Sequence, residues 1–151
     1  SNRSLIMEHN DKNKSCQCLQ CMIGKTAFAA HENAVMEKYG WLVHYVFDTN
    51  PYNIHTHGLP ENFGHPDFQI FANLSQTTAH AILVDLFLRV KSGEKFETGK
   101  KYNDVLKGYD LKFELAKEND RIVLRLIFPG KDGKFEGEFY ESQLTGIINI
   151  N

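Results

Sequence analysis

Three histidines occupy alternating positions on two short segments that are joined by a turn. His44 lies in the first segment, and His55 and His57 lie in the second. The residues Asp48–Pro51 between them have the composition of a tight turn. Because strand side chains alternate between two faces, a hairpin with this turn places His44 opposite His55, with His57 on the same face. His65 follows in the next loop and is the fourth histidine candidate.

Such a cluster is compatible with three kinds of chemistry, and the sequence leaves them open. Neutral imidazoles could hold Zn²⁺ with an open fourth position, as in catalytic zinc sites. One of the four histidines could instead act as a general base. The rings could also be hydrogen-bonded surface or core histidines without a reaction to perform. A register slip of one residue would separate His44 from the others.

A second cluster consists of three cysteines, Cys16, Cys18 and Cys21. Thiolates this close repel one another, and a bound zinc ion with four ligands would relieve that repulsion. The fourth ligand would come from His9, His31 or the histidine face. Unligated thiols, or a redox pair with a spare thiol, are the alternatives. The odd number of cysteines argues against a disulfide framework.

Charged residues offer weaker signals. Arg121 and Arg125 share one strand face and could form an anion site, or salt bridges with nearby carboxylates. Asp67 could orient the His65 ring or make a turn hydrogen bond. The phosphate-binding pattern G-x-x-x-x-G-K-[ST], the nucleophile pattern G-x-S-x-G and the zinc pattern H-E-x-x-H are all missing from the sequence.

Composition limits the partners that these residues could serve. The chain has 151 residues, which is the size of one domain. The net charge of −2 (17 − 19) provides no basic surface for nucleic acid. No apolar run approaches the ~20 residues that span a bilayer, so no membrane contact is expected. The polar N-terminus and the lack of an export signal predict a cytoplasmic protein.

The hydrophobic periods predict the elements that position the clusters. Helical spacing indicates two principal helices, and a period of two indicates strands in between. We expect an α+β fold, with a mainly antiparallel sheet and both helices packed on one face. Residues 1–15 are predicted to be a flexible arm, and residues 16–151 a single α+β domain. The predicted helices are Thr26–Tyr39 and Ser75–Lys91; the predicted strands are Trp41–Phe47, Tyr52–His57, Asp67–Ala72, Leu111–Leu115, Ile122–Phe128 and the edge strand Phe135–Tyr140, with a return of Gly146–Asn151 to the sheet.

One stretch of the chain resembles a known family. Gly40-Trp41-x-Val43-His44, His55-Thr56-His57-Gly58-Leu59 and His65-Pro66-Asp67-Phe68 follow one another as in the bacterial proteins catalogued as domain of unknown function 4262. In that family a Tyr-Thr-x-Gly-Leu-like segment is common where His55–Leu59 stands here, and Glu is usual where Asp67 stands. The resemblance brings no established activity, substrate or site residue.

These observations lead to three functional hypotheses. The first is a small cytoplasmic binding or interaction domain that is stabilised by zinc at the cysteine cluster. Its partner would be a small molecule or a protein, with a homodimer as one option. The alternative is a metal- or His-dependent hydrolase that uses His44, His55, His57 and His65. A toxin–immunity or stress partner is the third hypothesis, and no residue supports it directly.

Overall fold

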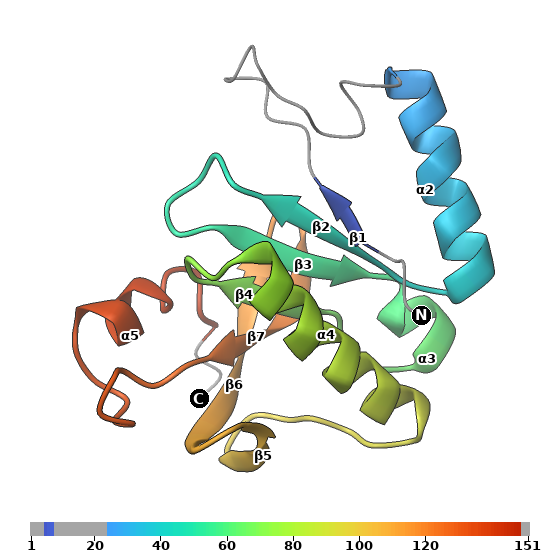
Figure 1. Ribbon diagram of the computed structural model, residues 1–151. Helices are drawn as coiled ribbons and strands as arrows, with labels where there is room; N and C mark the ends of the chain where they lie inside the picture. Colours follow the sequence, from blue (N-terminus) through green and yellow to red (C-terminus); the bar gives the residue numbers. More distant parts are fainter. Residues whose placement is uncertain (1–4, 8–23, 149–151) are drawn as a thin grey trace.

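A computed structural model describes residues 5–7 and 24–148 and shows an α+β fold built around one sheet (Figure 1). Its seven strands lie in the order β1-β2-β3-β4-β7-β6-β5. The sheet is mostly antiparallel, and only the pairs β1–β2 and β4–β7 are parallel. The strands are β1 (Leu5–Met7), β2 (Leu42–Val46), β3 (Asn53–His57), β4 (Phe68–Phe71), β5 (Tyr102–Leu106), β6 (Tyr109–Glu118) and β7 (Arg121–Ile127).

The hairpin of β2 and β3 has the register that the sequence predicts. His44 is the partner of His55, and Val46 is the partner of Asn53. The rings of Phe47 and Tyr52 then meet at the turn, with 4.9 Å between their centroids. The alternation of side chains and the length of the turn were therefore sufficient to place two histidines opposite each other.

The main core lies on the other face of this hairpin. Helix α4 (Gln76–Lys91) covers it, as Figure 1 shows, and begins where Ser75 accepts a hydrogen bond from the backbone N–H of Thr78. Trp41 is fully buried and stacks on Phe87 of α4, with 4.2 Å between ring centroids. Most of the buried apolar residues belong to this cluster. The helix that the apolar stripe predicts is confirmed.

The other long helix, α2 (Lys25–Tyr39), packs on a different part of the hairpin. Its buried residues Phe28 and Val35 contact Leu42, the neighbour of the core residue Val43. Successive strand residues point to opposite faces, so Leu42 lies on the face that carries His44. The prediction that both principal helices pack on one face is therefore not confirmed. Apolar residues of β2 are therefore buried on both of its faces, Val43 and Tyr45 on one and Leu42, beside His44, on the other.

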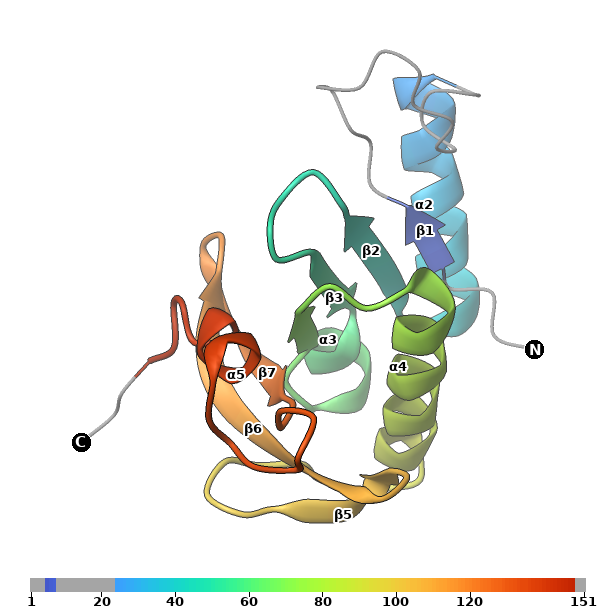
Figure 2. The ribbon, with the colours of Figure 1, turned by 60° about the vertical axis from the view of Figure 1, so that its left-hand side comes forward.

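Other segments of the chain differ in part from the predictions. The edge strand predicted at Phe135–Tyr140 is wrong: the residues Glu138–Ser142 form a short helix, α5, and β5 takes the edge position beside β6. The residues Leu59–Phe63, for which the sequence predicted no element, form the short helix α3. Of the C-terminal segment, residues 146–148 are described, and they meet the sheet through an isolated bridge between Ala116 and Ile147 rather than as a strand. Figure 2 shows α5 beside the long hairpin of β6 and β7.

The N-terminal part is described only at β1. Leu5–Met7 pairs with β2, with Ile6 as the partner of His44. The remainder of the predicted arm lies outside the described residues. Among the helices of the described chain, none combines the length and the apolarity that crossing a bilayer requires.

Candidate metal centre

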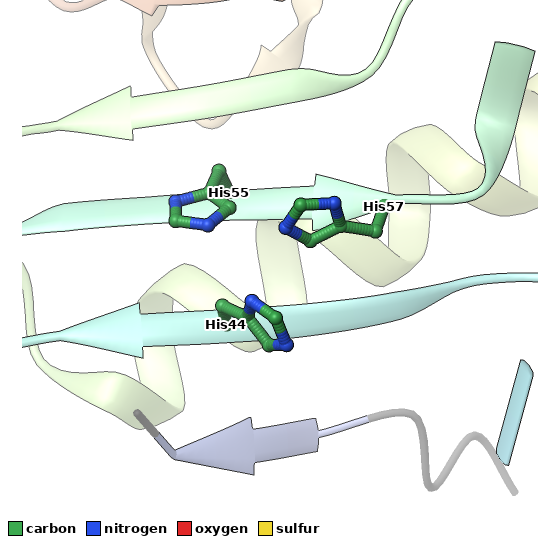
Figure 3. Close-up of side chains that lie close together, drawn as sticks. All are labelled: His44, His55 and His57. Atoms are coloured by element: carbon green, nitrogen blue, oxygen red, sulfur yellow. The ribbon is translucent and has the colours of Figure 1, made fainter. Parts of the chain in front are cut away.

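His44 of β2 and His55 and His57 of β3 form one cluster on the face that α2 flanks. Figure 3 shows the three rings gathered on neighbouring strands. One nitrogen from each ring lies within 4.8 Å of the other two. The ring centroids are 5.5 Å apart for His44 and His55, 4.5 Å for His44 and His57, and 5.0 Å for His55 and His57. The distances allow one ion to contact all three rings.

The surroundings favour the neutral form of two of these imidazoles, His55 and His57. Burial lowers the pKa of His55 to about 2, and the neighbouring His57, His44 and Arg121 charges lower it further in the same direction. Burial also lowers the pKa of His57 to about 3, with Arg121 and His44 as the further causes. Metal ions bind the neutral form of imidazole. Near neutral pH, His55 and His57 are therefore in the form that a metal requires.

Polar side chains from distant parts of the chain contact the cluster. The His44 Nε2 atom makes a short contact with Glu32 of α2. His55 is only 4% exposed, and its Nδ1 atom lies 3.1 Å from Asn53 Oδ1. The other ring nitrogen of His55, Nε2, lies 4.0 Å from the Oε1 atom of Glu118. Contacts of this kind orient histidine ligands in metal sites and raise their basicity.

A cavity of about 300 Å³ borders the cluster at His57. Its walls include Asp67 and Arg121, whose carboxylate oxygen and guanidinium nitrogen lie 2.8 Å apart. Asp67 also accepts hydrogen bonds from the Thr56 hydroxyl and the backbone N–H of Leu59. Burial raises the pKa of Asp67 to about 6, although the Thr56 bond and the Arg121 charge oppose this shift. A group that titrates near neutrality thus lines a cavity beside the histidines.

His65 is separate from the three. It is 3% exposed, its Nδ1 atom lies 2.8 Å from the Pro66 carbonyl oxygen, and its Nε2 atom accepts the backbone N–H of Phe96 at 3.0 Å. Both ring nitrogens are thus engaged in hydrogen bonds that tie the loop before β4 to the chain leading to β5. The structure gives His65 a packing position and does not bring it to the cluster.

The other sequence candidates have mixed outcomes. Cys16, Cys18 and Cys21 lie outside the described residues, as does His9. Arg121 forms salt bridges with Asp67 and Glu118, which is the second of the two roles considered for it. Asp67 bonds Thr56 rather than His65. Arg125 is buried and contacts no carboxylate within the described part of the chain.

Sequence reasoning missed the groups that surround the histidines. Asn53 stands two residues before His55 on the same strand face, so alternation could have identified it. Glu32 and Glu118 come from other elements, α2 and β6. Their approach depends on the tertiary fold, and no local pattern indicates it.

Comparison with known families agrees with the resemblance in the sequence. The profile of the family described as domain of unknown function (DUF4262) matches residues 35–138, and the chain belongs to this family. No curated protein and no solved structure matches the chain. The matched span contains His44, His55 and His57.

Proposed function

We propose that this member of the family binds a divalent transition metal ion, with zinc as the best fit, through His44, His55 and His57. The observation that carries the proposal is the approach of three ring nitrogens to within 4.8 Å of one another. A neutral imidazole can bind a metal ion through one ring nitrogen, and three histidines are a common ligand set for zinc.

The donor set supports a transition metal over calcium or magnesium. Imidazole nitrogens suit zinc, copper, nickel and iron, whereas calcium and magnesium prefer oxygen ligands. Three histidines also leave the fourth position of a tetrahedral zinc open for water or substrate. The buried carboxylate of Glu118, which is 3% exposed, adds negative charge beside His55. The Oε1 atom of the same carboxylate pairs with Arg121 at 2.7 Å, so the support for the proposal comes mainly from the three imidazoles.

Metal-assisted hydrolysis is the second function that the geometry favours. A zinc-bound water loses a proton near pH ~7 and becomes a nucleophile. The cavity beside His57 offers space for a small substrate, and Asp67 in its wall has a pKa near 6, which suits a proton acceptor. This hydrolase proposal depends on the metal proposal, whereas the metal proposal stands without it.

Metal binding to the full chain tests the proposal. The cysteines are first replaced (Cys16→Ser, Cys18→Ser, Cys21→Ser), so that a thiolate site cannot contribute. We expect this protein to take up one Zn²⁺, measured by titration calorimetry. Further replacement with His55→Gln or His57→Gln should weaken binding by ~10-fold or more, whereas the control His31→Gln, on the exposed surface of α2, should not.

Two results would overturn the assignment. Loss of zinc with the cysteine replacements alone would place the ion at the cysteine cluster, as in the binding-domain hypothesis. Retention of zinc in both histidine variants would exclude the histidine cluster. For the hydrolase proposal, zinc-dependent cleavage of an activated ester should be lost with His57→Gln. Equal cleavage with and without that change would refute it.

A further inference from the structure

A row of polar side chains crosses the sheet from the histidine cluster. His44 pairs with His55, His55 with Gln69, and Gln69 with Arg125, so the row runs over β2, β3, β4 and β7. Gln69 and Arg125 are each only 2% exposed. Polar groups at this depth need hydrogen-bond partners, and the pattern of their bonds is therefore informative.

The direction of each bond follows from Arg125, because a guanidinium can only donate. Its Nε atom lies 2.7 Å from Gln69 Oε1, so the oxygen of that amide faces the arginine. The Gln69 nitrogen must then point the other way, and it donates to Asn53 Oδ1 at 2.9 Å. The orientation of the Gln69 amide is therefore fixed, because Arg125 can only donate hydrogen bonds.

The same reasoning continues to the histidine. Asn53 presents its oxygen to Gln69, and His55 Nδ1 lies 3.1 Å from that same oxygen. An oxygen acceptor requires a donor, so His55 must carry its proton on Nδ1. In a neutral imidazole the other nitrogen, Nε2, is then unprotonated and is the one available to a metal.

We propose that Arg125, Gln69 and Asn53 are positioning residues that hold His55 in the Nδ1–H tautomer and so keep its Nε2 lone pair available in the cluster. The purpose of the relay rests on the proposed metal function, but the tautomer itself does not. The hydrogen bonds that set the tautomer of His55 form without a bound ion.

Arg125 is anchored firmly enough to act as the origin of the relay. Its Nη1 atom donates to the backbone carbonyls of Gln143, at 2.7 Å, and Thr145 in the C-terminal segment. Its guanidinium lies 4.5 Å from the ring centroid of Phe71. Burial lowers the pKa of Arg125 to about 10, which leaves it protonated near neutrality. The first bond of the relay, to Gln69, therefore comes from a permanent donor.

The tautomer can be read directly in the metal-free full chain by ¹⁵N NMR, which distinguishes protonated from unprotonated ring nitrogens. We expect the Nδ1–H form for His55 in the native protein. Gln69→Glu preserves shape and still accepts from Arg125, but it cannot donate to Asn53. The Asn53 amide should then turn its nitrogen toward His55, whose proton should move to Nε2.

The matched control is Asn53→Asp, whose side chain can only accept. It should keep His55 in the Nδ1–H form. In this variant the His55 tautomer no longer depends on the orientation of an amide at position 53. A native His55 in the Nε2–H form, or an unchanged Nδ1–H form in Gln69→Glu, would overturn the relay. These spectra are recorded without metal, so a failure of zinc binding alongside the expected tautomers would refute only the metal function.

Zinc affinity gives a second readout. With His55 protonated on Nε2, binding must first move that proton, and we expect Gln69→Glu to weaken zinc binding by ~10- to 100-fold, as for other changes to partners of metal ligands. Asn53→Asp should bind zinc at least as well as the native chain. Equal affinity in native and Gln69→Glu proteins would contradict the role of the relay in binding.

Discussion

Acidification should destabilise the metal-free protein through the buried histidines. In the unfolded chain a histidine takes up a proton below its ordinary pKa of 6.5, whereas His55 and His57 in the folded chain stay neutral down to about 2 and about 3. The unfolded state therefore binds more protons in this range. The stability that these two residues contribute is complete above pH 6.5 and is lost as the pH falls.

The size of the effect follows from the width of the pH interval. Between neutrality and pH ~5, each unperturbed histidine gains about 2 kcal/mol of proton binding in the unfolded state, at 1.36 kcal/mol per pH unit. Solvent reaches the half-buried His57, so we reduce its share to about 1 kcal/mol. Asp67 acts in the opposite direction. Its pKa in the folded protein, about 6, exceeds its ordinary 3.8, so the folded state takes up a proton on acidification and is stabilised by about 1 kcal/mol. The net loss is about 2 kcal/mol.

Urea unfolding followed by circular dichroism, in a chelator at pH ~7.5 and ~5, measures this difference. His55→Gln is the informative control. The comparison uses only the change in the free energy of unfolding between the two pH values, so a difference in absolute stability does not matter. Without the titration of His55, the loss on acidification should shrink by about 2 kcal/mol; the pKa of His65 is also lowered by burial, and its contribution is the same in both proteins. A native protein that is equally stable or more stable at the lower pH would refute the reasoning, as would an unchanged slope in the variant.

Other changes test the surroundings of the site. Gly58→Ala should cost about 2–5 kcal/mol in urea unfolding, because φ is +105° and a Cβ would lie 2.5 Å from the Gly40 carbonyl oxygen; Gly64→Ala, with φ of +66° and open space, should cost only about 1–2 kcal/mol. Leu83→Ala, on the buried side of α4, should lower the free energy of unfolding by about 2–5 kcal/mol, whereas Leu88→Ala, on the exposed side of the same helix, should change it by less than ~0.5 kcal/mol. Zinc at ~100 times its Kd should add about 2.7 kcal/mol of stability, and this gain should vanish in His57→Gln.

The parts of the fold that the sequence predicted are those set by neighbouring residues. A strand period of two and the turn at Asp48–Pro51 are enough to determine the β2–β3 register. The position of α2 is different, because Leu42 and Val43 are adjacent and both buried, so apolar residues on each face of the strand are compatible with a helix on either side. The segment around Phe135–Tyr140 is short, and two aromatic residues in it do not separate a strand from a turn of helix.

The residues of the candidate site also differ in whether neighbouring residues in the sequence predict their positions. Its three histidines come from one hairpin and could be found by alternation alone. Nearness in sequence was misleading for His65, whose ring accepts a hydrogen bond from Phe96 in a distant loop. The contact of Glu32 depends on how α2 packs on β2, and that of Glu118 on how the end of the β6–β7 hairpin approaches β3. Packing of this kind has no local signal, and only the structure supplies it.

The hydrogen-bond direction across the sheet also decides which sign of charge the site prefers. Arg125 was one of two arginines that could have formed an anion site. In the structure its donors are directed to Gln69 and to the carbonyls of Gln143 and Thr145. Arg125 donates to Gln69 and Gln69 donates to the Asn53 oxygen, and His55 donates to that same oxygen from Nδ1, so its Nε2 atom is left as an acceptor. An unprotonated Nε2 can bind a cation but not an anion. The charge of Arg121, which pairs with Glu118 and lowers the pKa of His55 and His57, opposes positive charge there, so a cation must be held by the bonds to the three nitrogens.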